Sequence, residues 1–224
     1  MIPCVSVKNM RCSDTYTIRN FVPGLELMYR AAMGVFKAHH WQGRTAIVAG
    51  SGNNGGDGFA LAWILKEKGF DCTVFTVSHR LSDDSAYYAT KAKASGVPIL
   101  PFGKGCLTNF TNVVDCLLGT GFSGIPRSNY YDAIEAINKS GAYIVSVDIN
   151  SGMNGDTGAA ELAVQSDLTV TIGFVKTGLV TKSAGKYIKH LLCVDIGIVL
   201  VQEEGYITEE NCPPWLDQNV IMSR

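Results

Sequence analysis

Short apolar segments rich in β-branched residues alternate with helical patterns along the chain, and this alternation limits the possible folds more than any other feature. The segments are continuously apolar, which is typical of strands buried on both faces. Strands that alternate with helices form a mostly parallel sheet covered on both sides, so an α/β fold is predicted. The predicted strands are residues 44–50, 72–77, 97–100, 112–119, 143–149, 167–173 and 191–198.

The length of 224 residues suits a single domain with a sizeable core. Residues 1–40 carry two helical patterns and are predicted to form a helical arm. Residues 41–200 contain the alternating segments of the core. Residues 201–224 are more polar and are expected to form a tail on the surface.

Composition and charge exclude several classes of protein. The net charge is −1 and the basic residues are scattered, so nucleic acid is not an expected partner. No apolar run is long enough to cross a membrane, and the N-terminus lacks the apolar core of a signal peptide. The seven cysteines contain no C-x-x-C pair, which favours reduced thiols in a cytoplasmic protein. The adjacent pair His39 and His40 would point in different directions on a helix, so a zinc site is not expected.

A glycine-rich stretch, "GSGNNGGDG" from Gly50 to Gly58, follows one predicted strand and opens a helix. Gly50, Gly52 and Gly55 match the pattern G-x-G-x-x-G, in which bare backbone lets N–H groups approach a phosphate at a helix start. The stretch therefore predicts a phosphate or pyrophosphate site. The alternative is a tight strand-to-helix turn that binds no ligand.

An ordinary nicotinamide oxidoreductase would carry an acidic residue at the end of the second core strand, where it binds a ribose. That strand ends in "FTVSHR", and Asp71 lies at its other end. The required acid is missing, which disfavours this class. Asn53, Asn54 and Asp57 also bring oxygen atoms into the glycine-rich stretch, and oxygen atoms suit a cation.

Two further carboxylates, Asp115 and Asp148, interrupt apolar strands near their carboxyl ends. A buried carboxylate is costly unless it has a partner. Three explanations remain open for each of them: a bound cation, a catalytic proton transfer, or hydrogen bonds from backbone N–H groups of the following turn. A second glycine-rich stretch, "GTGFSG" at 119–124, could also wrap a ligand.

Three stretches together resemble the NAD(P)H-hydrate epimerases, the family of the YjeF N-terminal domain: "GSGNNGGDGFALA", "VVDCLLGTGFSG" and "VSVDINSGMNGDTG". The resemblance covers nearly the whole chain up to about Val201. It implies a three-layer α/β/α Rossmann-like sandwich and a homodimer. It also implies an isomerase that interconverts the two C6 epimers of hydrated NADH and NADPH, here NADHX and NADPHX. The functional partner would be a dehydratase, on a separate chain or absent.

The resemblance also implies site residues. Asp148 would contact the ligand and act as the catalytic acid/base. Lys176 matches a family lysine that could anchor phosphate or stabilise charge, unless it is a solvated surface residue. A potassium ion would be the cofactor, bound by Asn54, Asp115 and Ser151. The ligand-binding residues would be Asn53, Asn54, Gly55, Gly56, Asp57, Gly119, Thr120, Gly121, Phe122, Ser123, Gly124, Ile125 and Asp148.

The chain departs from the family pattern at two places. Asn150 stands where the family usually has proline, which is expected to loosen the turn before Ser151 without removing a ligand atom. In the family, an arginine commonly comes earlier in this loop than Arg127 does here. Arg127 could take its place, so the sequence does not decide which residue contacts phosphate there. The main alternative function is a non-catalytic dinucleotide-binding or dimerising scaffold of the same fold. Such a module would be expected to lose the acid or the cation ligands, and this chain keeps both.

Overall fold

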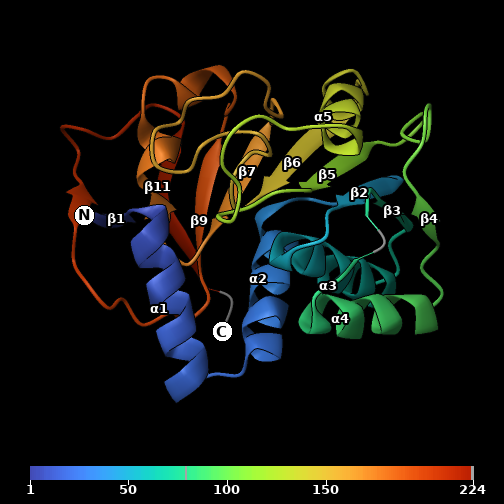
Figure 1. Cartoon of the computed structure of the whole chain (residues 1–224), viewed down its shortest axis with the longest axis horizontal. Coiled ribbons are helices and arrows are strands. Elements are labelled where there is room, and N and C mark those ends of the chain that lie inside the picture. The colour runs from blue at the N-terminus through green and yellow to red at the C-terminus, as the bar shows by residue number, and fades with distance from the viewer. Residues whose placement is uncertain (79, 223–224) are drawn as a thin grey trace.

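The computed structural model describes residues 1–78 and 80–222. Its main sheet has eight strands in the order β11-β9-β7-β6-β5-β2-β3-β4, and all neighbouring pairs are parallel (Figure 1). The mostly parallel sheet predicted from the sequence is confirmed. The strands are β2 (Thr45–Ala49), β3 (Cys72–Thr76), β4 (Ile99–Pro101), β5 (Asn112–Cys116), β6 (Tyr143–Val147), β7 (Leu168–Ile172), β9 (Leu191–Asp195) and β11 (Leu216–Met222).

The strand order reverses between β2 and β5. β3 and β4 follow β2 on one side of it, whereas β5, β6 and β7 are added on the other side. The connections that leave β2 and β5 therefore run in opposite directions, which opens a crevice beyond the carboxyl ends of the two strands. Ligands of open parallel sheets bind at such a switch point.

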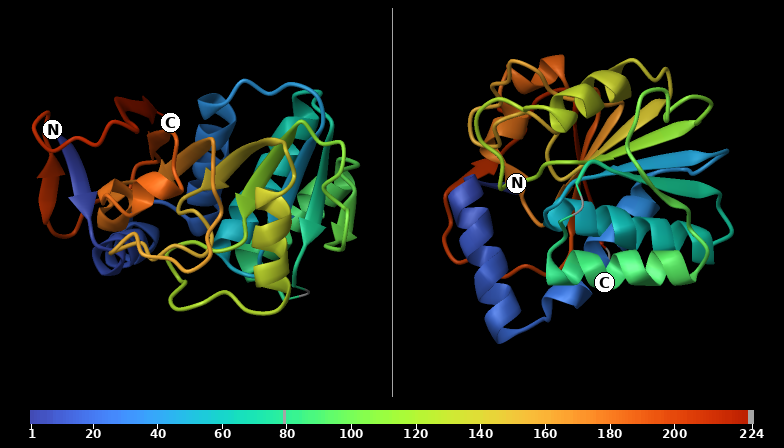
Figure 2. Two further views of the ribbon diagram at one scale, coloured as in Figure 1. Left: turned by 90° about the horizontal axis from the view of Figure 1, so that it is seen from above. Right: turned by 45° about the vertical axis from the view of Figure 1, so that its right-hand side comes forward.

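Helices cover both faces of the sheet, so the predicted three-layer α/β/α sandwich is confirmed (Figures 1 and 2). One face carries α2 (Gly24–Ala38), α3 (Asn53–Glu67) and α4 (Asp83–Ala94). The other carries α5 (Asn129–Asn138) and two short 3₁₀ helices, η1 (Thr177–Val180) and η2 (Ala184–Lys186). Successive residues of β2 enter different cores: Ile47 packs on the α2–α3 side and Val48 on the α5 side. Burial on both faces explains the continuously apolar strands.

The predicted helical arm divides into two parts. The first helix, α1 (Val7–Asn20), stands apart from the sheet at one end of the molecule (Figure 1). The second, α2, buries Leu27, Ala31 and Val35 in the main core and therefore belongs to a helical layer. A strand that the sequence analysis did not anticipate, β1 (Ile2–Val5), pairs with β8 (Val175–Lys176) and with β10 (Gly205–Ile207).

The expectation that residues 201–224 form a surface tail is wrong for the part that the structure describes. β10 pairs with β1, and β11 adds a parallel strand beside β9 at the edge of the main sheet. Trp215 donates a hydrogen bond from Nε1 to the Leu179 carbonyl oxygen at 3.0 Å. The sequence analysis did not predict these strands because the segment is polar. Strands at the edge of a sheet need little apolar surface.

Within the described residues, no helix combines the length and the apolar composition that a membrane span requires.

Candidate active site

The glycine-rich stretch forms the turn between β2 and α3. A Cβ atom on Gly50 would overlap the Leu117 carbonyl oxygen, and one on Gly55 would overlap the Gly50 carbonyl oxygen. These two glycines are therefore required by close approach of protein backbone. Gly52 caps α3 and faces open space, so its side is the one from which a ligand can reach the free N–H groups of the helix.

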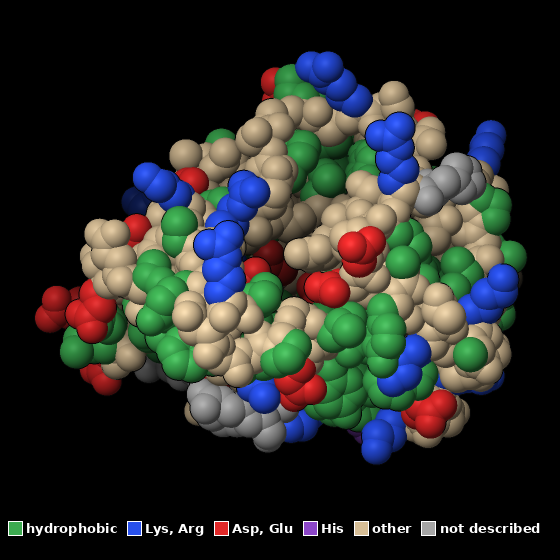
Figure 3. Space-filling view, turned by 60° about the horizontal axis from the view of Figure 1, so that its bottom comes forward, with side chains coloured by type: hydrophobic (Ala, Val, Ile, Leu, Met, Phe, Trp, Pro, Cys, Tyr) green, Lys and Arg blue, Asp and Glu red, His purple; other side chains and the backbone are tan. Residues whose placement is uncertain are grey.

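A cavity of about 680 Å³ lies at this turn, beyond the carboxyl ends of β2 and β5. Its walls come from α1, α2, the start of α3, the loop after β5, and the segments that carry Asp148 and Lys176. Figure 3 shows a face that is hollowed near its centre, with acidic side chains in the hollow and basic side chains nearby. A volume in this range matches those of small-molecule and cofactor pockets.

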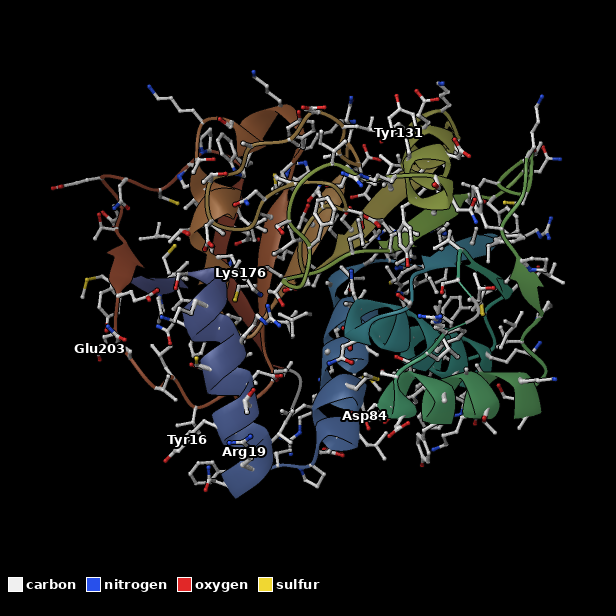
Figure 4. The ribbon with its side chains drawn as sticks, viewed as in Figure 1. Tyr16, Arg19, Asp84, Tyr131, Lys176 and Glu203 are labelled. Atoms are coloured by element: carbon white, nitrogen blue, oxygen red, sulfur yellow. The ribbon has the colours of Figure 1, made fainter. Side chains whose placement is uncertain are left out.

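Asp148 and Lys176 form an ion pair in this cavity. Asp148 follows β6 with a φ of 70°, in the left-handed region that non-glycine residues rarely adopt and that is frequent at functional sites. Lys176, labelled in Figure 4, lies on β8 and is fully buried. Its Nζ donates to Asp148 Oδ1 at 2.5 Å, to Thr171 Oγ1 at 3.1 Å and to the Ile172 carbonyl oxygen at 2.6 Å. The alternative of a solvated surface lysine is wrong.

Asp115 is fully buried on β5, outside the lining of the cavity. Its Oδ1 accepts from Leu117 N and Ser151 Oγ, and its Oδ2 accepts from Ser146 Oγ and Ser151 N. Burial raises the pKa of Asp115, and the hydrogen bonds, those from Ser151 foremost, oppose that rise. These contacts match the explanation by hydrogen bonds from the following turns, and a bound cation beside this carboxylate stays a prediction.

Asn54 presents an oxygen atom that has no partner. Its Nδ2 donates to the Leu118 carbonyl oxygen at 3.0 Å, whereas its buried Oδ1 accepts no hydrogen bond in the described structure. Asn54 and Asp148 both lie next to Gly119 and line the cavity. An orphaned amide oxygen in such a place is suited to a hard monovalent or divalent cation. The described residues contain no cluster of three His, Cys, Asp or Glu side chains of the kind that holds a transition metal.

Some of the other predicted ligand residues line the cavity and some do not. Gly55 and Gly56 face the protein interior: Gly55 contacts Gly50, and Gly56 contacts Met28. Gly124 and Ile125 lie beyond the lining of the cavity, and Ile125 is 49% exposed. The predicted residues that line the cavity are Asn53, Asn54, Asp57, Gly119, Thr120, Gly121, Phe122, Ser123, Asp148 and Lys176.

Sequence reasoning missed the contribution of α1 and α4. Arg11 and Asp14 of α1 and Asp84 of α4 also line the cavity. Burial raises the pKa of Asp14, and Asp148 adds to the rise while Lys176 opposes it. Burial, followed by Asp148 and Asp14, raises the pKa of Asp57 well above its ordinary value. Only the folded chain brings α1 to the cavity, so no local pattern marked Asp14 as a site residue.

Comparison with known families assigns the chain to a family. A family model described as "YjeF-related protein N-terminus" matches residues 24–178, which include the glycine turn, the Asp115 strand and the Asp148–Lys176 pair. The chain belongs to this family.

Relatives in the family extend the match to most of the chain. An NAD(P)H-hydrate epimerase from Limosilactobacillus fermentum is 33% identical over 85% of this chain and 95% of the relative. An NAD(P)H-hydrate epimerase from Limosilactobacillus reuteri is 38% identical over 81% of this chain and 89% of the relative. A bifunctional NAD(P)H-hydrate repair enzyme from Coxiella burnetii is 36% identical over 85% of this chain, and the match spans 41% of that longer enzyme.

A crystal structure of a yeast protein, YNL200c, shares the fold. The two structures superpose with a TM-score of 0.74 over 93% of this chain and 98% of the yeast chain, at 21% sequence identity. At this identity the likeness concerns the fold alone, and it agrees with the α/β/α architecture described above.

The structure overturns one expectation about the departures from the family pattern. Asn150 was expected to loosen its turn, but it is fully buried and its side chain ties the turn to three other segments. Nδ2 donates to Val164 O, Ser166 Oγ and Tyr187 O at 2.9–3.1 Å, and Oδ1 accepts from Thr169 Oγ1 at 2.6 Å. Arg127 is exposed and lies outside the cavity lining, so Arg11 is the arginine that reaches the cavity.

Proposed function

We propose that this chain is an NAD(P)H-hydrate epimerase, an isomerase that interconverts the R and S forms at C6 of NADHX and NADPHX. The observation that carries the proposal is the match to epimerases of similar length, which covers 85% of this chain and 95% of one relative. The site agrees with it, because a dinucleotide-type turn opens into the cavity that holds the Asp148–Lys176 pair.

The reaction needs a group that gives and takes a proton at C6. The hydrate carries a hydroxyl group next to ring nitrogen N1, and the N1 electron pair expels this hydroxyl as water once it is protonated. Water then adds back to the other face of the ring. Ring opening and closure at the same carbon requires similar proton transfers. Asp148 can supply one of them, and a well-placed acid/base contributes roughly 10²–10⁴-fold.

Lys176 fixes the geometry of Asp148. Its ammonium group is held by a hydroxyl and a carbonyl oxygen from the end of β7, so the third hydrogen bond orients the carboxylate. No hydride is transferred in this reaction, which agrees with the absence of a ribose-binding acid at the end of β3.

We also propose potassium as the cofactor, with Asn54 as its primary ligand and Asp115 and Ser151 beside it. The orphaned Asn54 Oδ1 supports this, and the Asp115 carboxylate supplies negative charge. The ion would add positive charge near the phosphates of a bound dinucleotide. Bound potassium should raise the melting temperature of the wild type, and Asn54→Ala should remove the increase. An equal increase in both proteins would contradict the site.

Three further properties are proposals: the cytoplasmic location follows from the cysteines, which include no C-x-x-C pair, and the other two follow from the family resemblance. The protein acts in the cytoplasm and forms a homodimer. The second step of hydrate repair, carried out by a dehydratase, is performed by a separate chain or is absent. Neither nucleic acid nor a membrane is proposed as a partner, because the net charge is −1 and the basic residues are scattered.

The decisive experiment follows one purified epimer of NADHX by chromatography in potassium buffer, at a pH where spontaneous epimerisation is slow. The protein should drive a fast approach to the equilibrium mixture, and Asp148→Asn should slow it by roughly 10²–10⁴-fold. Asp132→Asn, an exposed aspartate on α5, is the matched control and should keep full activity. A wild-type rate equal to that of the protein-free sample would refute the enzymatic function and favour a scaffold.

A further inference from the structure

Three carboxyl groups that line the cavity, those of Asp14, Asp57 and Asp84, take no part in the chemistry described so far. Asp14 enters from α1 and Asp57 from α3, and both line the cavity together with Asp148. In the part of the chain that the structure describes, neither side chain forms a hydrogen bond or an ion pair. Partly buried carboxyl groups that lack partners are costly, so they are expected where a ligand supplies the partner.

The contacts of α1 direct Asp14 toward the interior of the cavity. Met10, one helical turn earlier on the same side of α1, packs against Gly173 at the end of β7. The carbonyl oxygen of Ile172 in that same segment accepts a hydrogen bond from Lys176. Asp14 therefore projects from α1 toward the region of the Asp148–Lys176 pair.

Polar contacts fix α1 in this place, although the helix stands apart from the sheet. Ser13 Oγ accepts from Val201 N at 3.1 Å, and Thr17 Oγ1 accepts from Val199 N at 2.9 Å. At the start of the helix, Ser6 N and Oγ donate to the Glu204 carboxylate. The C-terminal segment thus holds the helix that carries Asp14, and the carboxyl group is held at a defined place in the wall.

The groups that face Asp14 favour a protonated carboxyl group there. Asp57 from α3 and Asp148 from the end of β6 are both acidic, and Lys176 from β8 is basic. Burial, followed by the charge of Asp148, raises the pKa of Asp14, and Lys176 opposes the rise. Arg11 lies on the same helix and lines the same cavity.

By the route in which water leaves and adds back, inversion at C6 needs chemistry on both faces of the ring. One proton is given to the hydroxyl group that leaves as water from one face, and one proton is taken from the water that adds to the other face. A carboxylate fixed in one wall reaches one face only, unless the ring turns over within the site. Asp148 is fixed in this way by Lys176.

We propose that Asp14 is a second acid/base residue of the site, acting on the ring face opposite to Asp148. The proposal rests on the proposed epimerase function. When water leaves from the α1 side, Asp14 gives the proton and Asp148 takes the proton of the water that adds; the reverse direction exchanges the two roles. Atoms and charge balance: one water is released and one is bound, Asp14 loses one proton and Asp148 gains one, and exchange of both carboxyl groups with solvent protons restores the starting state. The charge of Asp14 contributes to the raised pKa of Asp57.

The test separates loss of water from inversion. Each purified epimer of NADHX is incubated with the protein in water labelled with heavy oxygen. Inversion is followed by chromatography, and label that enters the unconverted epimer is followed by mass spectrometry. In Asp14→Asn, inversion should fall by roughly 10²–10⁴-fold in both directions. Label should still enter one of the two epimers, because Asp148 releases and returns water on its own face. Asp148→Asn should show the same behaviour with the other epimer.

Each outcome decides a different point. A wild type that neither inverts nor labels the substrate refutes the proposed function itself. An active wild type, with Asp14→Asn reducing inversion and labelling of both epimers by the same factor, overturns the role of Asp14, because a structural residue would act in this way. Asp14→Glu keeps the carboxyl group and should restore the wild-type ratio of inversion to labelling if Asp14→Asn folds poorly. A ratio in Asp14→Glu equal to that in Asp14→Asn also overturns the proposal.

Discussion

At the scale of single residues, the cavity concentrates acidic groups that fold stability alone would not select. Asp14, Asp57 and Asp148 share a space with one buried ammonium group, that of Lys176. Like charges in a partly buried site disfavour one another. Such a conflict with stability is typical of functional sites, where groups are arranged for a ligand rather than for the folded chain.

Asp57→Asn should stabilise the protein while it reduces ligand binding. Because the pKa of Asp57 is raised in the folded state, the folded protein binds the proton more tightly than the unfolded chain does. The wild type therefore loses stability as the pH rises above the ordinary carboxyl pKa of 3.8. The variant does not lose this stability. Its free energy of unfolding should exceed that of the wild type by about 1 kcal/mol at about pH 8, and by less toward about pH 4.

Urea unfolding of Asp57→Asn and the wild type across this pH range measures the effect. Asp132→Asn, which changes an exposed aspartate, serves as the control and should follow the wild type. A variant that is less stable than the wild type at the higher pH would contradict the prediction.

Asn150→Ala should destabilise the protein by about 2–3 kcal/mol, because it removes the buried hydrogen bonds of the amide to Val164, Ser166, Tyr187 and Thr169. Thermal unfolding measures the change. Asn150→Pro restores the residue usual in the family and should be destabilised to a similar extent, since the surrounding donors and acceptors are built around an amide. A proline variant as stable as the wild type would show that the turn adapts.

At the scale of elements, the turn between β2 and α3 separates glycines needed for packing from a glycine open to a ligand. Gly55→Ala should destabilise the protein by about 1–3 kcal/mol, because the new Cβ atom meets the rigid Gly50 carbonyl group. Gly52→Ala should leave the stability within about 0.5 kcal/mol, because its φ of −91° suits alanine and no atom lies within 4 Å. It should instead raise the KM for NADHX.

Thermal unfolding and steady-state kinetics on the two variants together test this division. Equal losses of stability in both would mean that the glycines serve only the turn. That outcome would also remove the support that the turn gives to dinucleotide binding.

At the scale of the whole molecule, segments near the two ends of the chain pair in a small three-stranded sheet with the order β10-β1-β8. β1 near the N-terminus pairs with β10 near the C-terminus, and β8, which carries Lys176, pairs with β1. The termini therefore contribute to the frame of the site rather than extending from a finished domain.

Truncation after residue 204 should lower the melting temperature by on the order of 10 °C or more, because β9 and β1 each lose one of their two neighbouring strands. Epimerase activity should fall with it, since β1 supports β8. Differential scanning calorimetry and the epimer assay measure the two effects, and Tyr206→Ala, which changes an exposed side chain, is the control. A truncated protein with wild-type stability would restore the reading of this segment as a surface tail.

The sequence by itself determined the alternating core, the parallel sheet and the glycine turn, because apolar period and glycine spacing are local properties of the chain. It also marked Asp148 and Lys176 through the family resemblance. The tertiary structure alone decided that α1 forms a wall of the site, that Lys176 is buried against Asp148, and that β11 belongs to the main sheet. Each of these depends on contacts between residues far apart in the chain, and such contacts leave no periodic trace in the sequence. Asn150 shows the same limit, since its four partners come from residues 164–187 and decide whether the turn is loose or tied.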